Sequence, residues 1–266
     1  MKNLAFVALL LAAPLALAEG PIQDNSFLVE EAYNQEDGVV QHINTFQRFR
    51  DSGGWIYTFT QEWPVGGLKH QFSYTIPVLR PGDAKAGVGD IALNYRYQLL
   101  GDGEAKVAIA PRFTVIVPSG DEKQGRGLGA TSYQNDNAMS IVLAPELVAH
   151  SNLGFTLTPH AHDADGHKAD LRAWNAGQSV VWLASQRVNF LLEAVYVSAQ
   201  ETSGAGHTTT VKSAVVSPGV RWSYDLESGL QIVPGIAFPF GVGPGRHEKS
   251  VFVYLSFEHP FKKIDR

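Results

Sequence analysis

The stretch Ile91-Ala-Leu-Asn-Tyr-Arg-Tyr-Gln-Leu99 decides the fold, because its apolar and polar side chains alternate strictly. Large apolar or aromatic residues occupy one set of positions: Ile91, Leu93, Tyr95, Tyr97 and Leu99. Small or polar residues occupy the other set: Ala92, Asn94, Arg96 and Gln98. Successive side chains of a β-strand point to opposite faces, so this period of two predicts a strand with one apolar and one polar face.

The same alternation recurs on both sides of that stretch, over nearly the whole chain. Further runs of this kind cover residues 39–50, 55–65, 72–78, 105–117, 139–149, 155–162, 174–184, 188–199, 215–225, 230–240 and 251–258. Short turns are expected at 66–67, 101–103, 151–154, 185–187 and 227–229. Longer, polar, Gly-rich connections are expected at 80–90, 118–138, 163–173, 200–213 and 241–249. Short and long connections therefore take turns along the chain.

This pattern predicts an all-β fold, a transmembrane antiparallel up-and-down β-barrel of about twelve strands with tight periplasmic turns and longer external loops. Aromatic residues such as Trp182 and Trp174 gather near the two ends of the apolar face, as in the aromatic girdles of such barrels. Closure would pair every backbone amide in lipid. The alternative is a water-soluble exported sandwich or lipocalin-like barrel, whose strands also alternate.

Bulk composition narrows the class of protein. The 266 residues carry a net charge of −5 and no cysteine, which excludes a disulfide-stapled scaffold and gives no basic surface for nucleic acid. Lys2, the apolar run 4–17 and the small-x-small site Ala16-Leu17-Ala18 predict a signal peptide over residues 1–18. An uncleaved N-terminal anchor is the alternative. We expect export to the cell outer membrane of a Gram-negative bacterium.

The remainder divides into residues 19–38, a barrel at 39–261 and a short charged tail at 262–266. Asn25 or Ser26 could cap a short helix, in which Leu28 pairs with Ala32 and Val29 with Tyr33 four residues apart. These apolar pairs suggest that 19–38 packs into the barrel mouth as a plug. A disordered periplasmic leader is the other interpretation. The aromatic run 251–258 resembles the terminal strand that the barrel-assembly machinery reads, although here a charged tail follows it.

Several motifs carry a family resemblance over most of the chain: residues 25–36 with 38–46, 111–113 with 118–121, and 218–221 with 235–239. The most specific is Gly89-Asp-Ile-Ala-Leu-Asn-Tyr-Arg-Tyr97. Together they resemble the outer-membrane transporter family named for the meta-pathway of phenol degradation. The resemblance implies a barrel and uptake of small apolar or aromatic compounds. It implies no catalytic or binding residues.

Charged residues on the polar face are the first candidates for a functional role. We expect these residues to line the lumen: Arg96, Arg112, Glu146, Glu193 and Arg221. They would form either a charge ladder that guides solutes or cross-strand ion pairs that brace a narrow barrel. The brace is the favoured interpretation, because charged groups need partners where water is scarce.

Histidines are the second candidates. His160 and His162 are expected on one strand face at the lumen, followed by Asp163, Asp165 and His167. That spacing allows a divalent metal, but a solvated loop root is the favoured interpretation and no metal or other cofactor is expected. Serines and histidines are otherwise scattered, without a Gly-x-Ser-x-Gly elbow, so we expect no enzyme.

The sequence thus predicts a porin-like barrel for passive uptake of small hydrophobic or aromatic molecules. Its expected partners are outer-membrane lipid, lipopolysaccharide, such solutes and the barrel-assembly machinery. A structural or surface-interaction barrel with a sealed lumen, or an outer-membrane lipid-modifying enzyme, is the alternative. The longest expected loop, 118–138, either folds inward to bind a solute or meets the lipopolysaccharide surface.

Overall fold

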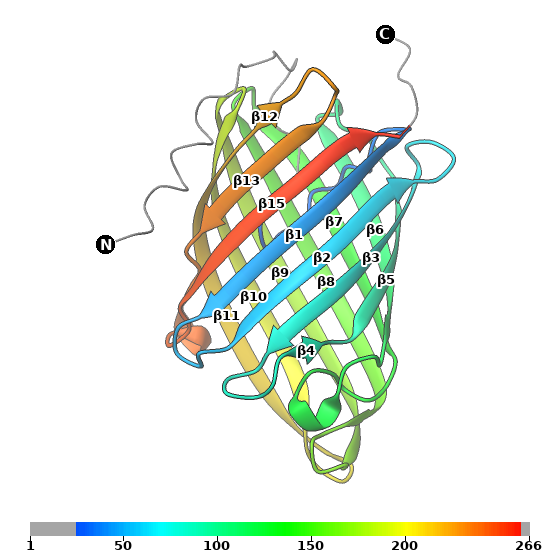
Figure 1. The fold of residues 1–266 in the computed structure, drawn as a ribbon, viewed down its shortest axis with the longest axis vertical. Helices are drawn as coiled ribbons and strands as arrows, with labels where there is room; N and C mark the ends of the chain where they lie inside the picture. Colours follow the sequence, from blue (N-terminus) through cyan, green and yellow to red (C-terminus); the bar gives the residue numbers. More distant parts are fainter. Residues whose placement is uncertain (1–24, 262–266) are drawn as a thin grey trace.

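The computed structural model describes residues 25–261, in which twelve long strands of one antiparallel sheet close into a barrel (Figure 1). The predicted signal peptide and the charged tail lie outside the described residues. The long strands are β1 (Val39–Phe49), β2 (Trp55–Pro64), β3 (His70–Arg80), β5 (Ile91–Tyr97), β6 (Val107–Val117), β7 (Ser132–Ala144), β8 (Leu147–His162), β9 (Lys168–Ser185), β10 (Val188–Gly204), β11 (His207–Trp222), β13 (Gln231–Ala237) and β15 (Ser250–Pro260).

Each long strand pairs with the long strands next to it in the chain, and one further pairing, between β1 and β15, closes the ring. β1 pairs with β15 over its whole length, and β13 pairs with both β15 and β11. The short strands β4 (Gly87–Val88), β12 (Tyr224–Asp225) and β14 (Phe240–Gly241) extend single ladders near the ends. The predicted fold class is confirmed. Among the described residues, no helix is long and apolar enough to cross a membrane.

The two faces of the sheet have the predicted character. In β5, Asn94 and Arg96 point inward and are buried, whereas Leu93 points outward and is half exposed. One inward row crosses neighbouring strands in register: Gln71, Arg96, Arg112 and Asp136. The inside of this part of the barrel is therefore polar, and the outside is apolar.

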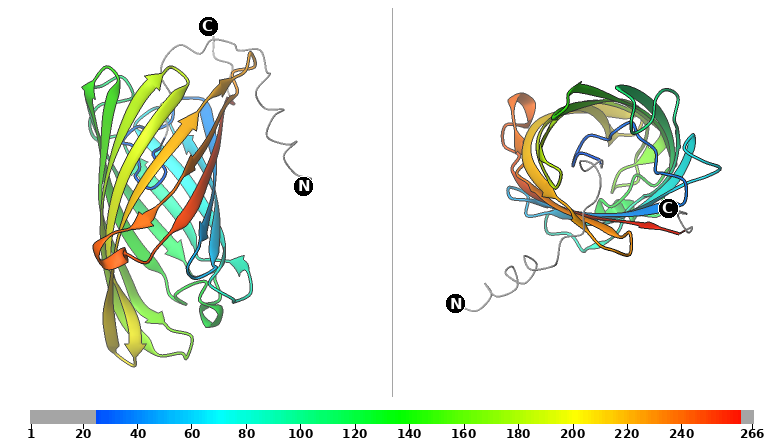
Figure 2. Two further views of the ribbon diagram at one scale, coloured as in Figure 1. Left: turned by 90° about the vertical axis from the view of Figure 1, so that its left-hand side faces the viewer. Right: turned by 90° about the horizontal axis from the view of Figure 1, so that it is seen from above.

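Hairpin lengths differ at the two ends of the barrel (Figure 2). The β8–β9 and β10–β11 hairpins run well past their neighbours at the end opposite the short turns, called the distal end below (Figure 1). We expected loops at 163–173 and 200–213, but β9 begins at Lys168 and the β10–β11 hairpin turns only at 205–206. Both faces of the distal part of β11 are exposed, so no apolar alternation marks these residues as strand. Backbone pairing alone extends the β10–β11 hairpin, whereas the extended part of β8 and β9 also buries the apolar cluster of Ala161, Ala169 and Leu171.

The expected turn at 151–154 is wrong, because β8 passes through it and the actual turn lies between Ala144 and Leu147. The turn was expected there because glycine is common in turns, and Gly154 ends the stretch. A Cβ on Gly154 would lie 2.3 Å from Asn175 Oδ1 and 2.6 Å from Asp136 Oδ2. This glycine therefore allows two inward-pointing polar side chains to approach the strand closely, and it does not mark a turn.

Asp90 ties together two of the long connections at the distal end. Its carboxylate accepts hydrogen bonds from the backbone N–H of Gly120 (2.8 Å) and of Leu128 (2.9 Å). Ser119 Oγ donates to the carbonyl of Gly89 at 2.8 Å. The short helix η2 (Glu122–Gln124) lies within this connection. Two motifs of the family resemblance, at 89–97 and 118–121, therefore meet at one carboxylate.

We expect Asp90→Ala to loosen residues 118–131 without unfolding the barrel. The change removes a charged acceptor from two backbone donors, at a cost of about 2–3 kcal/mol. Amide hydrogen exchange at Gly120 and Leu128 should accelerate, whereas exchange in β5 and β6 should not. Asp83→Ala, in the same connection between β3 and β5 but without a side-chain hydrogen bond to the described residues, is the matched control. Equal exchange in the two variants would refute the role of Asp90.

Candidate functional site

Residues 25–38, called the plug below, run inside the barrel ring before β1 begins (Figure 2). Its apolar side chains are deeply buried: Phe27, Val29, Ala32 and Tyr33. Within the described part of the chain, the plug pairs with no strand, so its backbone groups need other partners. The sequence-based proposal of a plug is thus consistent with the observed placement of these residues, but the expected short helix is wrong, because residues 25–38 are irregular.

Side chains of the barrel wall supply those partners along one edge of the plug. Glu193 Oε1 accepts from the backbone N–H of Leu28 (2.7 Å) and of Val29 (3.0 Å). The Asn152 side chain accepts from the N–H of Glu30 at 2.7 Å and donates to its carbonyl at 2.9 Å. These side chains take the place of a neighbouring strand.

The same arrangement continues toward β1. Ser140 Oγ accepts from the N–H of Ala32 at 2.8 Å. Gln98 accepts from the N–H of Asn34 at 2.9 Å and donates to the carbonyl of Ala32 at 2.7 Å. Gln71 Oε1 accepts from the N–H of Gln35 at 2.7 Å. Wall residues from β3 to β10 therefore form hydrogen bonds with the backbone of most plug residues between Leu28 and Gln35.

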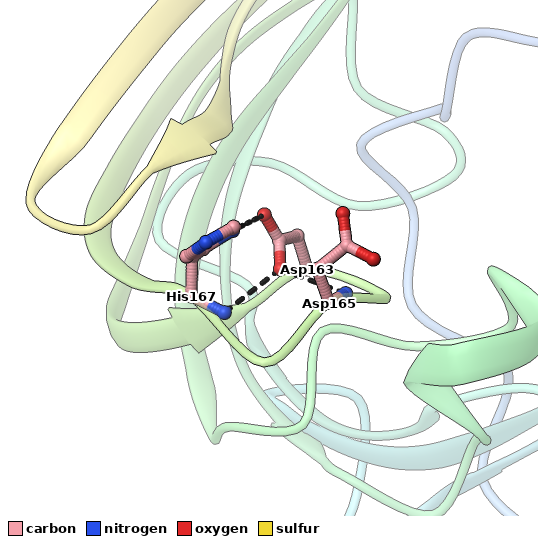
Figure 3. Close-up of side chains that lie close together, drawn as sticks. All are labelled: Asp163, Asp165 and His167. Carbon is pink, nitrogen blue, oxygen red and sulfur yellow. Dashed lines mark hydrogen bonds and ion pairs between the residues drawn. The ribbon is translucent and has the colours of Figure 1, made fainter.

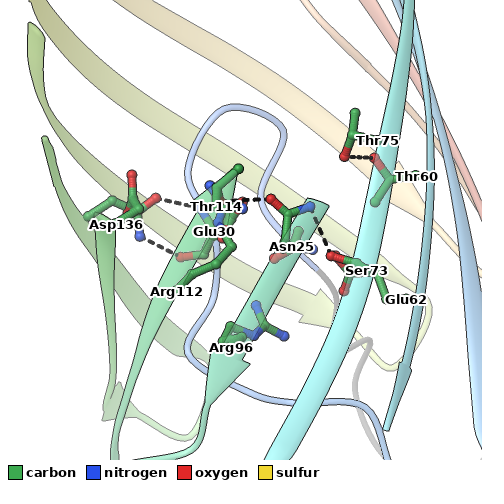
Figure 4. A network of polar contacts seen from close by, with 12 residues as sticks. Asn25, Glu30, Thr60, Glu62, Ser73, Thr75, Arg96, Arg112, Thr114 and Asp136 are labelled. Carbon is green, nitrogen blue, oxygen red and sulfur yellow. Dashed lines mark hydrogen bonds and ion pairs between the residues drawn. The ribbon is translucent and has the colours of Figure 1, made fainter. Parts of the chain in front are cut away.

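Arginines hold the plug carbonyls and one carboxylate. Arg96 donates to the carbonyls of Glu31 and Tyr33 and to the Asn34 side chain. Arg112 and Glu30 form an ion pair, and Figure 4 shows these two residues beside Asp136 and Arg96. Arg221 Nη1 donates to the carbonyl of Asn25 at 2.6 Å. Four of the five predicted lumen charges, Arg96, Arg112, Glu193 and Arg221, thus bind the plug.

Apolar contacts anchor the plug between Asn25 and Glu30. The Phe27 ring packs against Phe252 and Tyr254, with ring centroids 5.7 and 5.4 Å apart. A Cβ on Gly219 or Gly235 would lie 2.6 or 2.5 Å from the Phe27 ring. Glycine at these two wall positions therefore creates the space that the aromatic ring fills.

The structure places the other predicted residues differently. Glu146 is exposed in the turn between β7 and β8, so its expected position on the inner face is wrong. The His160 side chain is 83% exposed, and its Nδ1 lies 3.5 Å from Asp170. A β-bulge between Thr158 and Ala161 breaks the period of two and moves His160 out of the lumen. His162, near Gly129 at the distal end, is partly buried.

Asp163, Asp165 and His167 lie together in the β8–β9 turn, with their potential ligand atoms within 4.8 Å of one another (Figure 3). The Asp163 carboxylate accepts from the backbone N–H of Asp165 and from both the backbone and the ring of His167. Desolvation acts to raise the pKa of Asp163, but these hydrogen bonds outweigh it and lower the pKa below its ordinary value. The cluster closes a hairpin turn, and His160 and His162 are not part of it.

A cavity of about 270 Å³ lies beside the plug at the end of the barrel with the short turns. The plug contributes Glu31 and Tyr33, and the wall contributes an apolar set of residues. That set consists of Val142, Pro145, Val148, Val181 and Leu183. His150 and Arg221 complete the lining together with Glu104 from the β5–β6 turn. The cavity thus combines an apolar wall with a few polar groups.

Sequence reasoning missed the uncharged residues that hold the plug. Gln98 and Ser140 appeared only within predicted strands, Asn152 fell in an expected turn, and Gln71 lay outside the predicted strands. One usable signal was present: long amide side chains face inward on several strands in the half of the barrel with the short turns. An amide side chain both donates and accepts hydrogen bonds, so it can pair with the N–H and the C=O groups of a backbone segment inside the barrel.

The chain resembles solved barrels in fold. The NanC porin aligns with a TM-score of 0.56 at 12% identity, over 81% of this chain and 98% of that one. The KdgM porin aligns at 0.44 and 7% identity, covering 84% and 99%. The translocator domain of the autotransporter NalP from Neisseria meningitidis aligns at 0.47 and 11%, covering 84% and 87%.

No curated protein matches the sequence. A family model, described as "Putative MetA-pathway of phenol degradation", matches residues 24–257, which include the plug and almost the whole barrel. The strand 91–97, the Asp90 connections and the glycines beneath Phe27 all fall inside the match. The chain therefore belongs to the family of the MetA pathway of phenol degradation and has a porin-like β-barrel fold.

Proposed function

We propose that this protein lies in the outer membrane of a Gram-negative bacterium and admits small hydrophobic or aromatic molecules passively, without catalysing a reaction. Large apolar side chains on the outward face support the membrane location. Trp182, Phe113 and Leu192 are each more than half exposed, which suits hydrocarbon and would be costly in water. A closed sheet also leaves no unpaired edge in lipid.

The plug is the observation that carries the proposal of a gated route. It occupies the lumen yet is held by side chains, so it can leave without breaking any strand pairing of the barrel.

One pair of side chains bears on the alternative of an enzyme. Ser140 Oγ and His150 Nδ1 are 2.7 Å apart, the spacing of a nucleophile and a base. However, Ser140 is fully buried and accepts from the plug backbone, which favours a structural role for the pair.

Apolar residues on the inner face support hydrophobic solutes over sugars. Val142 and Val148 line the cavity beside the plug, and Leu191 packs in the buried apolar cluster near Phe27. A lumen for a strongly hydrated solute would have polar groups at these positions. The lipopolysaccharide leaflet slows apolar compounds, and a partly apolar conduit offers them a path.

We expect cells that lack the protein to take up phenol more slowly at low concentration, and the intact protein to restore the rate. A cross-link tests whether the plug controls this route. A Cβ on Gly177 would lie 2.9 Å from Val29 Cγ2, and the chain has no native cysteine. Val29→Cys with Gly177→Cys should therefore form one disulfide, and oxidation should lower phenol uptake to the deletion level.

The measurement is the initial uptake rate of radiolabelled phenol before and after reduction. Reduction should restore phenol uptake through the double variant, and the oxidant should not change the uptake rate of either single variant. Uptake that stays the same in the deletion strain would exclude the proposed conduit. Uptake that depends on the protein but not on the disulfide would exclude plug control alone.

A further inference from the structure

His150 contributes to the cavity beside the plug a ring nitrogen that is available to a ligand. His150 is 3% exposed, and its Nδ1 lies 2.7 Å from Ser140 Oγ. Its other ring nitrogen, Nε2, makes no hydrogen bond to the described residues and belongs to a side chain that lines the cavity. A buried imidazole normally has partners at both nitrogens, so this nitrogen is available to a ligand.

The wall around His150 is largely apolar. Val148, Val181 and Leu183 come from β8 and β9 and lie on the same side of the cavity as His150. The Tyr33 ring stands edge-on to the His150 ring, with centroids 6.3 Å apart. A cavity of about 150 Å³ accepts benzene in other proteins. The volume of about 270 Å³ therefore holds one ring with a substituent.

Charge in the cavity selects against anions. Two carboxylates, Glu31 and Glu104, line it together with one arginine, Arg221. Arg221 already donates to the plug carbonyl of Asn25. An aromatic carboxylate would therefore meet two like charges and one cation that is already engaged. An uncharged ligand avoids this repulsion.

We propose that this cavity is a binding site for an uncharged, single-ring aromatic alcohol whose hydroxyl pairs with His150 Nε2. A hydroxyl can donate or accept, so it suits either tautomer of the imidazole. The ring would lie against the valines and Leu183. The site faces the short-turn end of the barrel, on the far side of the plug from the long hairpins. It rests on the proposed function and specifies its substrate class.

The proposal predicts an order of affinity that ¹⁹F NMR can measure on the purified full chain in detergent. 4-Fluorophenol should bind about tenfold more tightly than fluorobenzene, because only the phenol satisfies His150. 4-Fluorobenzoate should bind more weakly than 4-fluorophenol, because of Glu31 and Glu104. Equal affinities for all three probes would overturn the assignment.

Variants separate the cavity from the detergent micelle. Val148→Trp fills the cavity and should abolish saturable 4-fluorophenol binding. Val115→Trp makes the same change on the outward face of β6 and should leave binding intact. His150→Leu should remove the preference for 4-fluorophenol over fluorobenzene while keeping ring binding. Binding that survives Val148→Trp would place the phenol elsewhere and refute the site.

These results are independent of the transport test. Phenol uptake that persists in the Val148→Trp strain, with binding lost, would leave the conduit standing and deny the site a part in transport. Saturable binding with the predicted order, in a protein whose deletion does not slow uptake, would support the site and refute the conduit. If the protein neither binds 4-fluorophenol nor increases phenol uptake, both the site and the conduit are refuted.

Discussion

Deletion of residues 25–36 is expected to convert the barrel into an open pore whose single-channel conductance rises on the order of tenfold or more. The plug fills the lumen with buried side chains such as Val29, which is only 1% exposed. Its removal returns the polar wall residues Gln71, Asn152 and Glu193 to water. Water can then form a continuous path that ions follow. Planar-bilayer recording with purified protein measures the change.

A length-matched control separates plug chemistry from chain length. Replacement of residues 25–36 by a Gly-Ser linker removes every plug side chain but keeps the connection to β1, so it should give the same open pore. Heat-modified electrophoretic mobility shows whether each barrel is folded. A folded deletion variant with an unchanged current would show that the plug does not close the lumen.

Glu193→Ala is expected to release the adjacent part of the plug while leaving the barrel folded. The wild-type carboxylate is fully buried and serves two backbone donors, at Leu28 and Val29. Their loss of an acceptor should cost about 3 kcal/mol of plug-docking free energy. Amide exchange at these two positions should then accelerate on the order of a hundredfold.

Two comparisons test the cause of that effect. Glu193→Gln keeps a carbonyl oxygen in the same place and should lose only part of the protection. Glu146→Ala removes a carboxylate from the exposed β7–β8 turn and should change nothing. If the alanine variant at 193 exchanged as slowly as the wild type, the carboxylate would not be what holds the plug.

The alternation of apolar and polar residues was enough to predict the barrel, because the strands have an apolar outward face and a largely polar inward face. The stretch around Tyr95 and Arg96 already contained that information. The distal hairpins could not be predicted in the same way, since β11 near Lys212 is exposed on both faces. Gly154 was also ambiguous, because one residue type serves both turns and close approaches.

The candidate site was predictable only in part. Arg96, Arg112, Glu193 and Arg221 could be placed on the inner face by counting along their strands, and they do lie there. Their partners could not be inferred, because pairing between Asn25 and Arg221 spans 196 positions. The bulge before Ala161 likewise depends on the neighbouring strand, so His160 was misplaced.

The long reach of the plug contacts determines a chronology for biogenesis. Asn25 and Leu28 precede every strand, yet their partners Arg221 and Glu193 lie on β11 and β10. The plug is translated and exported before β10 and β11. Asn25 and Leu28 therefore have no access to these partners until the two strands have been added to the barrel. We therefore expect the plug to dock only after β10 and β11 have joined the barrel.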